Sequence, residues 1–143
     1  MIGFFDTSVH VALLRGQATL DDVFERASVG PVRLSPVVAS ELLRGTRQRA
    51  RRAVERLVAG MVPIEPPSWR AGFLEAGRLL PRLFPDHEEI GLAGLQNDVL
   101  IALTARHTGA LLVALDAHFV ALRRLVPFHL VLLPSISGRS RRK

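Results

Sequence analysis

Five short apolar segments, separated by longer stretches of helical periodicity, most constrain how this chain can fold. They lie at residues 2–5, 32–34, 61–64, 110–115 and 129–133. Their apolar residues run almost without interruption, which is typical of strands that are buried on both faces. Because helical stretches separate them, we predict an α/β fold with a mainly parallel central sheet.

The helices between these strands are marked by capping signals and by apolar periodicity. The capping signals are Thr7 or Ser8, Thr19 with Asp22 as a capping box, and Ser35 before Pro36. In the helix expected at residues 68–84, Phe73 is predicted to face the core. The expected helices cover residues 7–15, 19–27, 35–45, 46–59, 68–84, 91–107 and 117–125.

Length and composition indicate one folded domain. The chain has 143 residues, of which 48% are hydrophobic and 22% charged, enough for one core but not for two. We assign residues 1–134 to this domain and expect residues 135–143 to form a flexible basic tail. The chain has no cysteine, which excludes disulfides and thiolate zinc sites and fits a reducing compartment.

The sequence carries no sign of a membrane segment or an export signal. Its longest stretch without a charged residue, residues 125–138, is 14 residues long and contains two prolines, too short to span a bilayer. The N-terminus lacks a basic region and reaches Asp6 early, unlike a signal peptide. We therefore expect a cytoplasmic protein without a membrane partner.

The net charge of +6 is concentrated in two segments. Residues 44–57 contain six arginines and one glutamate, and residues 137–143 contain four cations, which leaves the rest of the chain at −3. Such basic segments attract the phosphates of nucleic acids, although a solvated helix face is the alternative. We expect RNA contacts from Arg44, Arg47, Arg49, Arg51 and Arg52.

Four carboxylates stand at positions where the pattern predicts burial. Asp6 and Asp116 directly follow apolar strands, whose carboxyl ends border the crevice where α/β sheets bind ligands. Glu41 and Asp98 project from apolar faces of their predicted helices. Any one of them could be an isolated cap or ion-pair partner, but four together predict a shared site relieved by a divalent cation. Periodicity alone does not exclude Glu65 from this site.

A carboxylate site without cysteine or clustered histidine favours Mg²⁺ or Mn²⁺, which support phosphodiester hydrolysis. Receiver domains and haloacid-dehalogenase phosphatases also place Asp at strand ends, but both need a Lys, and Lys143 is the only one. Metal-free ribonuclease chemistry would need paired histidines, and the five histidines show no pairing pattern. Glycine-rich phosphate loops are also absent from the sequence.

Four motifs resemble, in order and spacing, those of PIN-domain nucleases: FFDTSV, SPVVASELLRG, NDVLIALTARH and LLVALDAHF. Over residues 1–134 the chain is most similar to the VapC-type toxins of bacterial toxin-antitoxin pairs. The resemblance implies a three-layer α/β/α fold and an Mg²⁺ or Mn²⁺ cofactor. It also implies endoribonuclease activity on structured RNA, homodimerisation and inhibition by a VapB-like antitoxin.

The resemblance also implies roles for individual residues. Asp6, Asp98 and Asp116 would be catalytic acids that face the metal, and Glu41 would ligate it directly or through water. The side chains that would surround these acids are those of Thr7, Ser8 and Asn97.

Two positions depart from the family pattern. Ala114 stands where a Thr or Ser usually precedes the fourth acid, and His118 replaces an acid sometimes found after it. We interpret His118 as a surface residue, with contact to a phosphate as the alternative. The leading hypothesis is a metal-dependent endoribonuclease, the toxin of a type II toxin-antitoxin system. The alternative, motivated by Ala114, is a PIN scaffold that binds RNA or a protein partner without cleaving.

Overall fold

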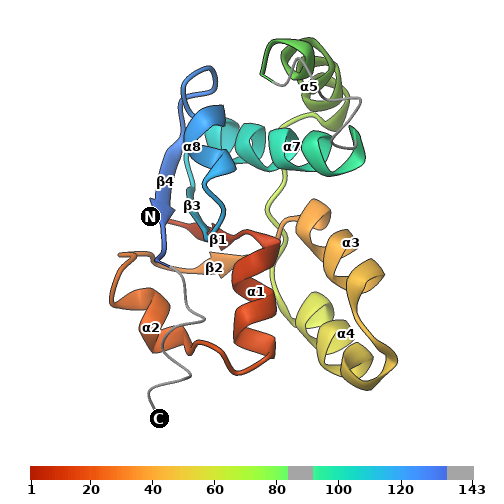
Figure 1. Ribbon diagram of the computed structural model, residues 1–143, viewed down its shortest axis with the longest axis vertical. Coiled ribbons are helices and arrows are strands. Elements are labelled where there is room, and N and C mark those ends of the chain that lie inside the picture. The colour runs from red at the N-terminus through yellow and green to blue at the C-terminus, as the bar shows by residue number, and fades with distance from the viewer. Residues whose placement is uncertain (84–91, 135–143) are drawn as a thin grey trace.

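A parallel four-stranded sheet lies at the centre of the computed structural model, which describes residues 1–83 and 92–134 (Figure 1). All three strand pairings are parallel, which confirms the predicted α/β class and the parallel sheet. In spatial order the strands are β2 (Val32–Arg33), β1 (Gly3–Phe5), β3 (Leu111–Ala114) and β4 (His129–Leu132).

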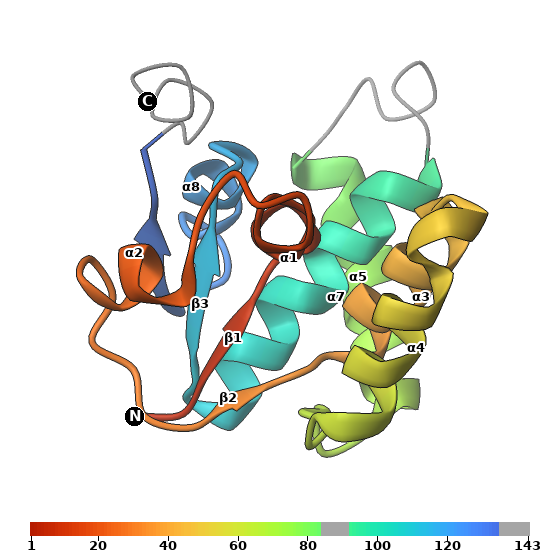
Figure 2. The same ribbon diagram turned by 90° about the horizontal axis from the view of Figure 1, so that it is seen from below.

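Helices cover both faces of this sheet, so the expected three layers are present. Phe5, Leu111 and Val113 point to one face, where they pack in a core cluster with Val9 and Val23. The opposite face carries a larger cluster, and Figure 2 shows α2 and α7 on opposite sides of β1 and β3. The first face is covered by α1 (Thr7–Leu14) and α2 (Leu20–Phe24). On the other side lie α3 (Pro36–Gly45), α4 (Arg51–Gly60), α5 (Trp69–Leu83), α7 (Leu92–Thr108) and α8 (His118–Leu122).

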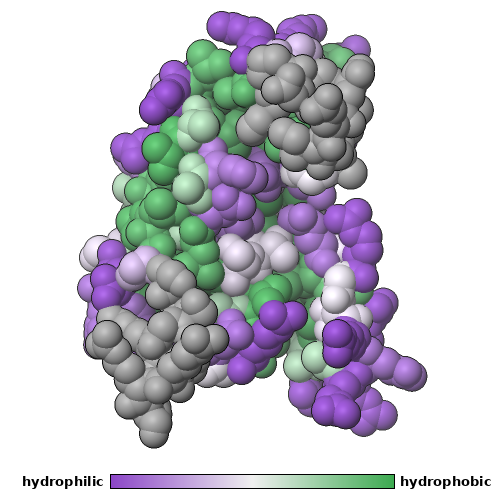
Figure 3. Space-filling model, in the orientation of Figure 1, coloured by the Kyte–Doolittle hydropathy of each residue, from purple (hydrophilic) through white to green (hydrophobic). Residues whose placement is uncertain are grey.

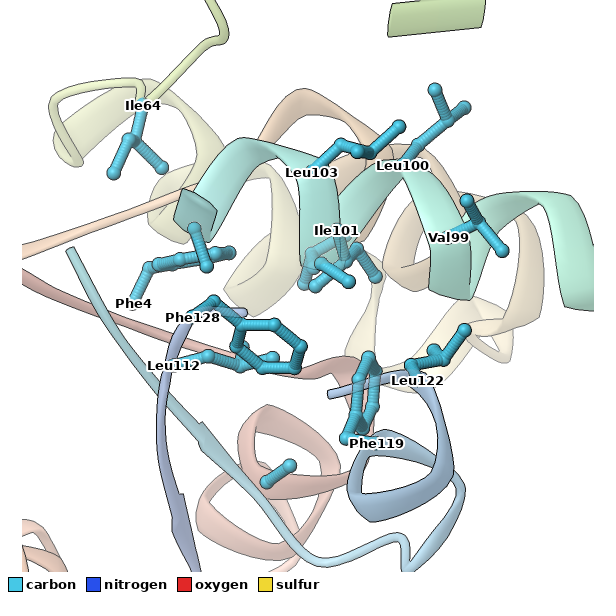
Figure 4. Close-up of a cluster of buried hydrophobic side chains, with 14 of the residues drawn as sticks. Phe4, Ile64, Val99, Leu100, Ile101, Leu103, Leu112, Phe119, Leu122 and Phe128 are labelled. Carbon is cyan, nitrogen blue, oxygen red and sulfur yellow. The ribbon is translucent and has the colours of Figure 1, made fainter. Parts of the chain in front are cut away.

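The larger core is built around α7. Residues 99–103 of this helix are almost fully buried, although they point in several directions around its axis. They pack with Leu112 of β3, with Phe119 and Leu122 of α8, and with Phe128 (Figure 4). A helix that is apolar all round is a buried helix, and each large side chain buried here contributes about 1.5–3 kcal/mol.

The strand order creates a switch point between β1 and β3. From β1 the chain first builds β2 on one side and later β3 on the other. Connections that leave the carboxyl ends of β1 and β3 therefore diverge and leave a crevice, the usual ligand site of such sheets. The amide of Asp6 donates to the carbonyl of Val113 at 2.9 Å and extends the pairing to the edge of this crevice.

The strand predicted at residues 61–64 is wrong. This segment makes only an isolated parallel bridge between Leu34 and Pro63, flanked by hydrogen bonds of 2.9 and 3.0 Å. Pro63 has no amide proton, and Pro66 and Pro67 follow soon after, so the segment cannot continue a regular ladder.

Two of the predicted helix caps are confirmed and one is wrong. Thr19 and Asp22 form a reciprocal capping box, and the Ser35 hydroxyl accepts from the amide of Val37 at 3.2 Å. The N-cap of α1 is Asp6 and not Thr7 or Ser8. The hydroxyls of these two residues donate instead to the carboxylates of Glu41 and Asp6.

The predicted inward face of α5 is shifted. Phe73 is 47% exposed, whereas Gly72, Ala76 and Leu80 are buried. A Cβ on Gly72 would lie at ordinary contact distance, 3.9 Å, from Leu100 of α7, so the face of α5 that carries its small residues is the one turned to α7. Close helix packing, which periodicity does not report, sets the orientation of this helix.

Two predicted segments fall outside the described residues: the PDHEE loop at 85–89 and the basic tail at 135–143. In the part of the chain that is described, no helix has the length and apolar character needed to cross a membrane.

Two glycines, one inside α7 and one just after it, provide a test of how this helix is terminated. Gly109 follows α7 with a φ of 72°, whereas Gly94 lies within the helix, and at neither position would an added Cβ meet a neighbouring atom within 4 Å. We expect Gly109→Ala to destabilise the fold by about 1 kcal/mol and Gly94→Ala to stabilise it by about 0.5–1 kcal/mol. Urea unfolding of both variants measures this, and effects of the same sign would contradict it.

Candidate active site

Asp6 and Asp116 stand at the switch point, each just beyond a central strand. Asp6 follows β1 directly and is only 6% exposed, and the Ser8 hydroxyl donates to its Oδ2 at 3.1 Å. The side chain of Asp116 is 44% exposed, and its Oδ1 accepts the amide of His118 at 2.9 Å. Both acids predicted from the strand ends therefore lie at the edge where β1 and β3 diverge.

Glu41 and Asp98 reach the same region from two helices that contact each other, α3 and α7. The hydroxyl of Thr7 donates to Glu41 Oε1 at 2.8 Å, which joins α1 to α3 beside Asp6. The side chain of Asp98 is only 21% exposed, because α7 is buried along most of its length. Segments far apart in the sequence thus bring all four predicted acids to one end of the sheet.

The electrostatics show that Asp6 and Asp98 are each raised in pKa by neighbouring acids of the set. Burial raises the pKa of Asp98 to about 7, with repulsion from Asp6, Glu41 and Asp116 acting in the same direction. Burial also raises the pKa of Asp6, opposed by hydrogen bonds from the Thr7 amide and the Ser8 hydroxyl. Repulsion from Glu41 and Asp116 adds to the increase in the pKa of Asp6. The site therefore holds excess negative charge in a poorly solvated place.

The chemistry of these donors fits a hard divalent cation. They are all oxygen ligands, and no Lys or Arg among residues 1–83 and 92–134 forms an ion pair with them. Across the same residues, no three Asp, Glu or His side chains lie close enough together to hold a metal ion as they stand. The acids thus have no Lys or Arg as an ion-pair partner among the described residues. Their side chains keep a distance from one another, as expected of like charges.

Of the three residues expected around the acids, two contact them. Thr7 bonds to Glu41 and Ser8 to Asp6, as described above. Asn97 instead lines a pocket with Trp69 and Phe73, and the described structure gives it no hydrogen bond to the four acids. The side chain of Asn97 leaves α7 on a different side from that of Asp98.

His118, which the sequence suggested as a surface residue, also lies beside two of the acids. Its side chain is 55% exposed, as expected, but its Nδ1 lies 3.4 Å from Asp116 Oδ2 and 3.9 Å from Asp98 Oδ2. The signal in the sequence was its place two residues after Asp116, at the start of a helix. That spacing brings its ring back over the acid.

Two other acids lie outside the cluster. Glu65 accepts a hydrogen bond from the indole of Trp69 at 3.0 Å and is not among the groups that act on Asp98. Glu75 pairs with His107 at 3.1 Å. The structure thereby separates Glu65 from the four acids, which periodicity could not do.

The predicted RNA-binding arginines all lie exposed around the turn between α3 and α4. One of them has a structural role, because Arg51 donates to the carbonyl of Leu43 at 3.0 Å and pairs with Glu55 at 3.6 Å. This places its guanidinium near the last carbonyls of α3, where positive charge is favourable. The other predicted RNA contacts are Arg44, Arg47, Arg49 and Arg52.

Burial of Asp98 makes the stability of the metal-free protein depend on pH. Its native pKa of about 7 lies above its ordinary value of 3.8, so ionisation destabilises the fold. This cost is absent below about pH 4 and fully present above about pH 7. We expect Asp98→Asn to stabilise the protein by on the order of 3 kcal/mol at pH 8 and by little at pH 4.

Thermal unfolding in a chelator at both pH values measures this difference. Glu25→Gln, which removes one exposed carboxylate after α2, serves as the control and should show no such pH-dependent gain. A gain for Asp98→Asn that is equal at pH 4 and pH 8 would refute the assignment.

The comparisons with known proteins concern the fold and the family of the chain. Three solved VapBC structures share the fold, each matching over 92% or 93% of this chain and 98% or 99% of that chain. VapBC-1 from nontypeable Haemophilus influenzae has a TM-score of 0.62 at 22% identity. VapBC2 from Rickettsia felis, bound to a DNA fragment from their promoter, has 0.58 at 18%, and VapBC-5 from Mycobacterium tuberculosis has 0.52 at 24%. No curated protein matches the chain.

The match to a family model covers most of the chain. It is the model of the PIN domain, and it aligns with residues 3–125, a range that includes all four acids. This chain belongs to the PIN domain family.

Proposed function

We propose that this protein is a Mg²⁺- or Mn²⁺-dependent endoribonuclease and the toxin of a type II toxin-antitoxin system. One observation carries the proposal: acids that follow β1 and β3 and acids on α3 and α7 meet at the switch point, where their repulsion raises the pKa values of Asp6 and Asp98. A cluster of this kind, on a PIN domain, supports hydrolysis of a phosphodiester more readily than phosphoryl transfer to a carboxylate or metal-free RNA cleavage.

The acids and their neighbours would hold the cofactor and orient the substrate. A bound divalent ion would supply an activated water and neutralise the charge that develops on the phosphoryl oxygens. Ser8 fixes the Asp6 carboxylate, Thr7 fixes Glu41, and the His118 amide fixes Asp116. These bonds hold the oxygens in defined orientations before any ligand arrives, which reduces the cost of assembling the site.

The proposal predicts the chemistry of the products. Attack of water on phosphorus leaves a 5′-phosphate and a 3′-hydroxyl. A 2′,3′-cyclic phosphate would instead mean that the 2′-hydroxyl of the RNA attacked, and this mechanism would be wrong.

We propose a VapB-like antitoxin as the protein partner, a homodimer as the assembly, and the cytoplasm as the location. Support for the antitoxin comes from the fold, which is shared with chains of three VapBC structures. Because identity to these chains is 18–24%, the partner of this chain needs its own measurement.

The second candidate function is a PIN scaffold that binds RNA or a protein without cleaving. Ala114 favours it, because this residue is completely buried and offers no hydroxyl beneath Asp116. The main-chain bond from His118 orients Asp116 without that hydroxyl, and therefore supports the catalytic proposal.

Cleavage of RNA with added Mn²⁺ separates the two candidates. We expect wild type to cleave and Asp98→Asn to be slower by at least about 100-fold, because a metal-facing carboxylate is lost. Glu25→Gln serves as the matched control and should cleave like wild type. Equal activity of wild type and Asp98→Asn would exclude catalysis at this site.

The arginines around the α3–α4 turn are expected to contact RNA. Replacing Arg44, Arg49 and Arg52 by Glu should weaken binding and flatten its salt dependence, by about 0.7 in log–log slope for each phosphate that is no longer bound. The control replaces Arg70, Arg78 and Arg106, exposed on α5 and α7, in the same way. Fluorescence anisotropy with labelled single-stranded RNA measures the slopes. Unchanged slopes would mean that these arginines form a solvated surface and do not contact RNA.

A further inference from the structure

A cleft of about 230 Å³ opens beside the acids, between α1 and the end of α3. At one end lies Thr7, whose hydroxyl holds Glu41, and Leu42 forms part of the opposite wall. Arg15 lines the cleft from the end of α1, and Arg47 lines it from the turn that follows α3. The remaining lining residues are Val11, Leu14, Gly45, Thr46 and Ala50.

The two arginines of this cleft are free to bind an anion. Both are exposed, and among the described residues neither makes an ion pair or a side-chain hydrogen bond. Arg51 nearby differs, because it is held by Leu43 and Glu55. No acidic residue of the described chain lines the cleft, so its lining offers two positive charges and no carboxylate to pair with them. A phosphate would neutralise these charges, and guanidinium groups match phosphate oxygens in geometry.

The cleft is separate from the acid cluster. Thr7, Val11 and Arg15 recur every four residues along one stripe of α1, which puts Arg15 about 12 Å along the helix from Thr7. No arginine is among the groups that act on the carboxylates of Asp6 and Asp98. Among the described residues, the arginines are therefore not counter-ions of the acids, which leaves them available for the anion of a ligand.

We infer that Arg15 and Arg47 together bind a non-scissile phosphate of the RNA substrate. This inference rests on the proposed function and adds to it a path for the substrate. The RNA strand then runs from the acids along α1 towards the turn after α3. Figure 3 shows hydrophilic side chains gathered near this turn, at the lower right. Figure 1 shows where the two ends of this path lie, at the start of α1 and at the loop between α3 and α4.

Binding of a fluorescein-labelled, random-sequence single-stranded RNA in a chelator tests the inference without cleavage. The variants are Arg15→Gln, Arg47→Gln and the double variant. We expect the double variant to bind about tenfold more weakly and to lower the log–log salt slope by about 0.7, as for one phosphate. Because both side chains hold the same phosphate, the double variant should lose less than the product of the two single losses.

Matched variants control for charge and folding. Arg106→Gln removes an exposed arginine near the end of α7, which leads into the start of β3 and so lies at the opposite end of the sheet. It should leave the slope unchanged. Arg15→Lys should keep the slope of wild type, and all variants should keep its melting temperature. With Mn²⁺, loss of either cleft arginine should raise KM several-fold and leave kcat within about twofold.

The outcomes distinguish this inference from the proposed function. If wild type cleaves RNA but the double variant keeps its binding and salt slope, the cleft does not bind phosphate although the nuclease proposal stands. The same conclusion follows if Arg106→Gln weakens binding as much as the double variant. If wild type neither binds nor cleaves RNA, both proposals fail.

Discussion

Mutual repulsion among four carboxylates, of which Asp6 and Asp98 are the most buried, is the constraint on which the site depends. Burial and three neighbouring acids together raise the pKa of Asp98 to about 7, which means that ionising this carboxyl is unfavourable in a place where water solvates it poorly. Such an arrangement persists only if the surrounding packing is stable enough to offset it. A divalent cation would remove the repulsion, so the feature that destabilises the free protein is also the one that provides affinity for a cofactor.

The packing that offsets this cost is concentrated in α7 and in the parallel strands beside it. Residues 99–103 of α7 are buried on several sides, and Asp98 lies directly before them. The carboxylate is therefore attached to one of the most buried segments of the molecule. Asp6 is fixed in the same way, because its amide continues the pairing of β1 with β3. Rigid attachment keeps the acids from separating freely to relieve their repulsion.

Positive and negative charges occupy different parts of the same surface. The acids gather where β1 and β3 end, while Arg15 and Arg47 lie near the end of α1 and in the turn after α3. If arginines had paired with the acids, they would have lowered the pKa values of the carboxylates and competed with a metal. Separation leaves the acids available for a cation and the arginines available for a polyanion, which together suit a substrate that carries a chain of phosphates.

The sequence by itself determined the α/β class, most helices and the identity of the four acids, because apolar runs and misplaced charges are local signals that survive without coordinates. Only the tertiary structure decided that residues 61–64 are a bridge, that Phe73 is exposed, and that Glu65 lies apart from the acids. Likewise, the approach of His118 to Asp98 and the position of Arg15 and Arg47 in one cleft join residues from different segments. Such contacts depend on how helices dock on the sheet, and docking is set by the fit of whole surfaces and not by the period of any one segment.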